Sequence, residues 1–113
     1  MASHVAELVR AEIIAVSDHA VTLGGAPVAD TAELARLGDW RITNLHDQLV
    51  TLKNNYKLLH PSEEFNGIAI VQSDKNVEFK VLKKIMYSIS VAGYQNVNFA
   101  VIPKTRAGAA PAP

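Results

Sequence analysis

The sequence predicts an α+β fold, a two-layer sandwich in which two helices cover one face of a mixed, open β-sheet. Short apolar segments rich in β-branched residues and bounded by turn residues indicate strands. Two longer segments repeat apolar residues every three or four positions, which is typical of amphipathic helices. The second of these helices lies between two predicted strands, and this order favours a right-handed βαβ unit with parallel strands.

The first two predicted strands form a hairpin. Residues 11–17 (AEIIAVS) are apolar and β-branched, and Asp18-His19 separates them from residues 20–23 (AVTL). Gly24-Gly25 follows as a second turn. We therefore expect an antiparallel pair at the start of the domain.

The segment 26–41 has the weakest pattern in the chain. It contains Pro27 and Gly38, and it predicts one helical turn over residues 31–37 with Thr31 as its capping residue. No strand is predicted in this segment.

The first long helix is predicted to start at Asn44, which can cap it, with Asp47 in its first turn. Pro61 marks the end of this helix. Its apolar stripe recurs at spacings of four, three, four and three residues: Leu45, Leu49, Leu52, Tyr56 and Leu59.

The βαβ unit begins with a buried strand over residues 67–73 (GIAIVQS). Asp74 and Asn76 are predicted to form a turn and the start of a helix over residues 77–92, where a carboxylate meets unpaired backbone N–H groups and the positive end of the helix dipole. The predicted apolar face of that helix consists of Val81, Leu82, Ile85, Met86 and Ile89. We expect Phe79 and Met86 to pack between helix and sheet.

The unit closes with Gly93 as a left-handed helix cap and a strand over residues 96–102 (NVNFAVI). The domain is therefore assigned to residues 11–103. Residues 1–10 are interpreted as an N-terminal extension, and residues 104–113 as a flexible tail rich in Ala and Pro.

Composition excludes several classes of function. The 113 residues suffice for one hydrophobic core, and their formal charge of zero provides no global attraction for nucleic acid, so no nucleic-acid partner is predicted. The longest apolar runs, such as residues 13–16, are far shorter than the ~20 residues that a membrane-spanning helix needs. We therefore expect that this chain does not cross a membrane.

No catalytic, metal-binding or cofactor-binding residue is predicted. The chain has no cysteine, and Gly24-Gly25 lacks the Lys-Ser or Lys-Thr of a phosphate loop. The four histidines, at positions 4, 19, 46 and 60, do not have the spacing of a helical metal site. Ser17-Asp18-His19 is interpreted as a polar turn and Glu63-Glu64 as a hydrated pair, so the protein is predicted not to be an enzyme.

The candidate binding residues are Lys80, Lys83, Lys84 and Trp40. The lysines share the second long helix, and from Gly67 onward the chain has six basic residues against two acidic ones. Two interpretations remain open for each feature: the lysines form a solvated face or attract an anionic polymer or acidic partner, and Trp40 packs within its loop or forms part of an interface. The open sheet also leaves an edge through which we expect a homodimer.

The order of residues in the second half resembles a known family. Residues 68–79 (IAIVQSDKNVEF), continued by Val81, Ile85-Met86, Ala92-Gly93 and 97–100 (VNFA), are similar to the extramembrane domain of the ExbD/TolR biopolymer-transport family. That domain has a strand ending in Asp, then a Val, an aromatic residue, a helix with Val-Met, an Ala-Gly pair and a closing strand. Residues 21–28 (VTLGGAPV) resemble its second strand, glycine turn and Pro-Val, whereas the segment 29–41 is longer than is usual there.

The resemblance implies a dimeric domain without a cofactor on the periplasmic side of the bacterial inner membrane. It implies a single transmembrane helix outside this chain that would pair with a channel subunit of the ExbB/TolQ type. A TonB/TolA-like protein or peptidoglycan would be the periplasmic partner. Such proteins convert ion-motive force into mechanical work in biopolymer transport, Tol or motility systems.

The βαβ unit alone leaves a second interpretation open, a soluble ferredoxin-like regulatory or small-ligand-binding module, because a fold does not determine a function. An apolar segment of ~20 residues upstream of Val5 in the complete protein would distinguish the first interpretation from the second.

Overall fold

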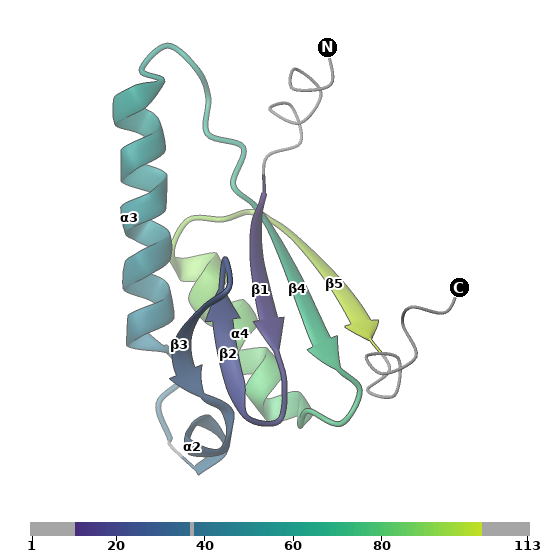
Figure 1. The fold of residues 1–113 in the computed structure, drawn as a ribbon. Helices are drawn as coiled ribbons and strands as arrows, with labels where there is room; N and C mark the ends of the chain where they lie inside the picture. The colour runs from purple at the N-terminus through teal and green to yellow at the C-terminus, as the bar shows by residue number, and fades with distance from the viewer. Residues whose placement is uncertain (1–10, 37, 103–113) are drawn as a thin grey trace, which may run out of the picture.

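The computed structural model describes residues 11–36 and 38–102. In chain order the elements are β1 (Glu12–Val16), β2 (Ala20–Leu23), β3 (Ala26–Asp30), α2 (Thr31–Arg36), α3 (Thr43–Leu59), β4 (Ile68–Asp74), α4 (Phe79–Val91) and β5 (Asn96–Ile102). The strands form one sheet in the order β3-β2-β1-β4-β5, with α3 and α4 against one face (Figure 1). The predicted α+β sandwich is therefore confirmed, with the strand β3 as an additional element.

The strand pairings agree with the predicted units. β1 and β2 form the expected antiparallel hairpin, with Val16 opposite Val21. β4 pairs with β5 in parallel along its whole length, from Ile68 opposite Asn96 to Asp74 opposite Ile102, which confirms the parallel strands of the predicted βαβ unit. β1 also lies parallel to β4, so β1, β4 and β5 all begin at the same end of the sheet.

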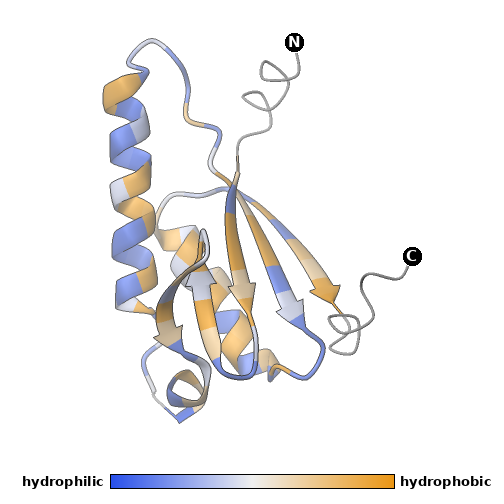
Figure 2. Cartoon of the chain, viewed as in Figure 1, coloured by the Kyte–Doolittle hydropathy of each residue, from blue (hydrophilic) through white to orange (hydrophobic). Residues whose placement is uncertain are grey.

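The core lies between the sheet and the helices. Apolar residues follow one another along β1 and the first part of β4 (Figure 2). Successive side chains of a strand point to opposite faces, and only one face is covered: Ile14 is fully buried, whereas its neighbour Ile13 is 37% exposed. Leu45 and Leu49 of α3 and the predicted inner face of α4 close this layer. The buried apolar residues of α4 are Val81, Leu82, Ile85 and Ile89.

The segment between β2 and α3 is more regular than the sequence predicts. β3 was not predicted because Pro27 reads as a turn residue, but proline is tolerated at a sheet edge, where β3 lies. The short helix follows at Thr31–Arg36, close to the predicted position, although residue 37 lies outside the described residues. Its predicted cap is wrong: the Asp30 Oδ1 atom accepts the Glu33 N–H at 3.2 Å, while the Thr31 hydroxyl donates to the Ser17 carbonyl at 2.7 Å.

The caps predicted for the two long helices are also wrong. α3 is preceded by Ile42 without a side-chain cap, and the Asn44 amide instead donates to the Val28 carbonyl at 2.8 Å. α4 begins at Phe79, after Glu78, so Asp74 and Asn76 do not start the helix. They do form the predicted turn, in which the Asp74 carbonyl accepts the Val77 N–H at 3.3 Å.

Gly93 caps α4 as predicted. Its φ is +99°, and the Tyr94 N–H donates to the Ile89 carbonyl while the Gly93 N–H donates to the Ser90 carbonyl. These two bonds form the Schellman motif, which needs a left-handed residue at this position. The motif turns the chain from α4 into β5.

We predict that Gly93→Ala lowers the free energy of unfolding by about 1–2 kcal/mol, because an L-residue is strained in the left-handed region. A Cβ at this position would also collide with the Lys53 side chain. Urea denaturation followed by circular dichroism measures the change. Gly25→Ala, with φ +91° but open space around its Cβ, is the matched control for the backbone strain alone. A Gly93→Ala variant as stable as the parent would contradict the proposed cap.

The predicted N-terminal extension and the Ala/Pro tail lie outside the described residues. Among the helices within residues 11–36 and 38–102, none has both the length and the apolar character needed to span a bilayer.

Candidate binding surface

The three candidate lysines of α4 do not share one surface. Lys80 and Lys83 lie on the exposed side of the helix, where the Lys80 Nζ atom is 3.6 Å from a carboxylate oxygen of Glu78. Lys84 is 93% buried, with 7% of its surface exposed, and its Nζ donates to the Leu34 carbonyl of α2 at 2.7 Å. The prediction that Lys84 forms part of a basic surface is therefore wrong, because this side chain joins two helices inside the domain.

Trp40 lies next to the remaining lysines. Its ring meets the Tyr87 ring edge-on, with 6.1 Å between the centroids, and the Lys83 Nζ atom is 5.5 Å from its centroid. The same Lys83 Nζ atom is 5.5 Å from the centroid of Phe79. Trp40 is 50% exposed and Phe79 is 70% exposed, so neither ring belongs to the core, and the prediction that Phe79 packs between helix and sheet is wrong. Met86 is also exposed, at 37%, so the prediction that it belongs to the inner face of α4 and packs between helix and sheet is wrong as well.

We name the residues Trp40, Phe79, Lys80, Lys83 and Tyr87 the α4 outer surface. Tyr87 was not among the candidates, although helical spacing could have identified it: Lys80, Lys83 and Tyr87 are three and four residues apart and so share a face. Trp and Tyr are among the residues most enriched at binding hot spots, and a lysine ammonium near an exposed aromatic ring adds a weak attraction.

The loop that carries Trp40 is held at both ends by buried polar groups of α4. On one side Lys84 binds the carbonyl of Leu34. On the other side the Ile42 N–H donates to the Ser88 hydroxyl at 2.7 Å, and that hydroxyl donates to the Lys84 carbonyl at 2.8 Å. These bonds fix the loop against α4, so Trp40 is presented in a defined position rather than on a free loop.

The strand β5 provides a second exposed surface. Its register with β4 places Val97, Phe99 and Val101 on the side of the sheet that the helices cover, but Phe99 is 43% exposed and Val101 is 54% exposed. The outer edge of β5 is formed by seven residues without proline or charge. β3, at the opposite edge, carries Pro27 and a register shift in its pairing with β2. Edges interrupted in this way resist further pairing, so β5 is the edge suited to accept another strand.

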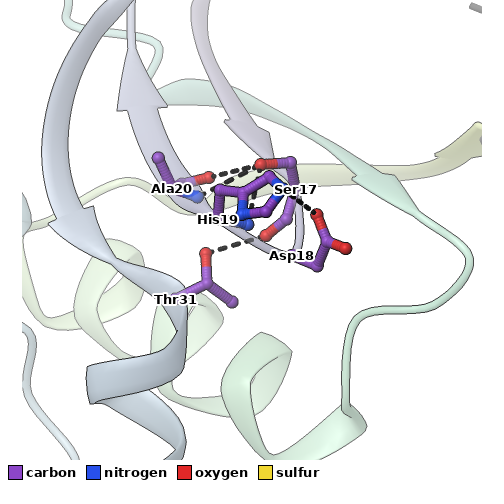
Figure 3. Close-up of polar contacts among 5 residues, drawn as sticks. All are labelled: Ser17, Asp18, His19, Ala20 and Thr31. Carbon is purple, nitrogen blue, oxygen red and sulfur yellow. Dashed lines mark hydrogen bonds and ion pairs between the residues drawn. The ribbon is translucent and has the colours of Figure 1, made fainter.

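The Ser17-Asp18-His19 turn has the geometry of a structural turn (Figure 3). The Ser17 hydroxyl oxygen accepts the N–H groups of His19 and Ala20, both at 3.1 Å. The imidazole lies 3.4 Å from Asp18, and the Ser17 carbonyl accepts the Thr31 hydroxyl. The serine thus organises the β1–β2 turn and attaches α2 to it, instead of pairing with the imidazole.

Within residues 11–36 and 38–102, no three His, Asp or Glu side chains come together as the ligands of an ion. Comparisons of the chain with models of protein families, with curated proteins and with solved structures give no match.

Proposed function

We propose that this chain is the non-enzymatic periplasmic domain of an ExbD/TolR-like subunit of the bacterial inner membrane. In this proposal a membrane helix upstream of residue 5 pairs with an ExbB/TolQ-like channel subunit, and ion-motive force moves the domain. The domain binds peptidoglycan or a TonB/TolA-like protein and transmits the force to it. In this proposal the domain dimerises and binds its partner, and it catalyses no reaction.

The observation that carries the proposal is the agreement between the residue pattern and the elements on which it falls. The Asp of the pattern, Asp74, is the last residue of β4, the aromatic Phe79 is the first residue of α4, and Gly93 follows α4 before β5. Residues 21–28 cover β2, its glycine turn and the start of β3. A mixed sheet with helices on one face is the fold that this pattern implies.

The proposal includes a homodimer that pairs through the β5 edge. The unpaired backbone groups and the exposed Phe99 and Val101 would be covered if the β5 strands of two copies paired antiparallel about a two-fold axis. Such pairing extends the five-stranded sheet continuously across the dimer. The α4 outer surface then occurs twice in the assembly, which favours an extended or repetitive partner.

Peptidoglycan is a testable occupant of the α4 outer surface. We predict that Lys80→Glu together with Lys83→Glu weakens retention of the chain on isolated cell-wall sacculi by about tenfold, and that added salt weakens the parent in the same way. Lys57→Glu together with Lys75→Glu, which reverses two exposed lysines outside the α4 outer surface, is the charge-matched control and should retain parental binding. Equal retention of all variants would exclude this surface as the cell-wall contact.

Reporter enzymes fused to the complete protein test on which side of the membrane the domain lies. Alkaline phosphatase, which is active only outside the cytoplasm, is fused after residue 113, and β-galactosidase, active only inside, is fused at the same position. We expect an active phosphatase and an inactive galactosidase. The opposite pattern would place the domain in the cytoplasm and contradict the proposed function.

A further inference from the structure

Two adjacent leucines project from the end of α3. Leu58 is 78% exposed and Leu59 is 76% exposed, the highest values among the large apolar side chains of residues 11–36 and 38–102. Lys57 precedes them and His60 follows, so the last turn combines apolar and basic side chains. Figure 2 shows the apolar end of this helix. We name residues 57–60 the α3 tip.

The tip protrudes because α3 is longer than the sheet that it covers. Leu49 is the last fully buried residue of the helix, and its carbonyl accepts the Tyr94 hydroxyl at 3.0 Å. The ten residues from Leu49 to Leu59 extend the helix by about 15 Å past that point. Figure 1 shows the end of α3 beyond the end of the sheet. Within the predicted apolar stripe, Leu52 and Tyr56 are partly buried, and the last member, Leu59, is exposed.

The tip lies at the end of the domain where β1 begins. β1, β4 and β5 are parallel, and the loop from α3 leads into β4 at this end. Ala11 and Glu12 line the same surface hollow as Tyr56 and Phe65. Tyr56, in the last turns of α3, stacks against His60 with 4.5 Å between the ring centroids. The start of β1 and the α3 tip are therefore neighbours.

We propose that Leu58 and Leu59 dock into the headgroup region of the lipid bilayer. This inference rests on the proposed function, in which a membrane helix precedes residue 5. Ten residues precede Ala11 in the chain and span at most about 35 Å, so in this proposal Ala11 stays within that distance of the membrane surface. Because the α3 tip lies at the same end of the domain, the tether directs it toward the lipid.

The shape and charge of the tip favour lipid over a protein partner. The leucines protrude from a helix end, which suits insertion among lipid headgroups, whereas protein anchors usually fill a pocket between partners. Lys57 can extend its ammonium group to the phosphates while its stem follows the apolar surface. Glu63 and Glu64 follow in the next loop and offset that charge, so the contact is mainly hydrophobic and only weakly dependent on salt.

The test uses the chain attached to vesicles of phosphatidylethanolamine and phosphatidylglycerol through an N-terminal hexahistidine tag on nickel-chelating lipid. Because the chain has no cysteine, Ser62→Cys provides a single site for an environment-sensitive dye beside the tip. Lys75→Cys, in the turn after β4 at the opposite end of the sheet, is the matched control. Neither dye replaces a leucine.

We expect the dye at position 62 to move to shorter emission wavelength on tethering and to be quenched by lipid-borne quenchers, while the dye at position 75 remains unchanged. Each leucine contributes about a tenfold preference for the lipid. Leu58→Ser with Leu59→Ser should therefore abolish the response at position 62 without changing the thermal stability of the domain.

Three outcomes would overturn the docking: dyes at both positions responding alike, a response at position 62 that survives the loss of both leucines, or a response only when a membrane protein is reconstituted in the vesicle. The last outcome would assign the tip to a protein contact. The vesicle experiment does not require the native anchor, so it can fail while the proposed function stands. Equally, a complete protein without an anchor would remove the proposed function without changing this result.

Discussion

Lys84→Glu is expected to lower the free energy of unfolding by about 4 kcal/mol, because it places a carboxylate in a buried site beside the Leu34 carbonyl. Two losses add: the hydrogen bond that holds α2 is removed, and an uncompensated negative charge is left near the carbonyl end of that helix. The exposed lysines of the same helix undergo the same charge change at little cost. Lys80→Glu should destabilise the domain by less than about 1 kcal/mol.

Urea denaturation of the two variants, followed by circular dichroism, measures this difference. The fluorescence of Trp40, the single tryptophan, reports separately on the loop that Lys84 and Ser88 anchor. In Lys84→Glu we expect the Trp40 emission to change before the global transition. Equal stability of the Lys84→Glu and Lys80→Glu variants would show that Lys84 lies on the surface.

Val101→Pro is expected to raise the dissociation constant of the homodimer at least about a hundredfold. The Asn96 N–H donates to Gly67 at the start of β4, so alternate residues of β5, including Phe99 and Val101, direct their N–H groups toward the open edge. Proline at position 101 removes one of these donors and puts its ring in the path of the second strand. The loss occurs twice in a symmetric dimer.

Sedimentation velocity between micromolar and millimolar concentration gives the dissociation constant. Val101→Thr keeps both the β-branched side chain and the N–H, so it should dimerise nearly as well as the parent. The proline variant should keep the stability of the monomer because the donors to β4 come from the alternate residues. A parent chain that stays monomeric at about 1 mM would exclude pairing through β5.

The elements that could be predicted from the sequence are those that bury one face, because such elements repeat apolar residues at regular spacings. Short apolar, β-branched segments predict the strands of the hairpin and of the βαβ unit, and helical spacing predicts α4. The role of Gly93 as a cap is predicted by the left-handed backbone that a helix end often requires. The parallel register of β4 and β5 follows in turn from the crossover through α4. These features depend on local sequence alone.

The missed features depend on contacts between distant segments. Nothing near Asn44 shows that its amide will bind the carbonyl of Val28, and a strand containing Pro27 forms only because β3 lies at an edge. The end of the α3 stripe at Leu59 stays exposed because the sheet ends first. Local spacing cannot show how far a helix extends beyond its partner layer.

Only some residues of the candidate surface could be predicted from the sequence, for the same reason. Lys80, Lys83 and Trp40 were identified by residue type, and the structure brings Lys83 and Trp40 together. Lys84 has the same residue type and helical neighbourhood, and its burial results from α2 folding over it. Phe79 was assigned to the core by its apolar character, although its position on the helix is outside the buried face.

Cell fractionation of the complete natural protein tests the central claim most directly. If the domain is a membrane-tethered part that transmits force, the protein will stay in the membrane pellet after washing with alkaline carbonate, and only detergent will release it. Recovery of the full-length protein in the soluble fraction, without detergent, would contradict the account.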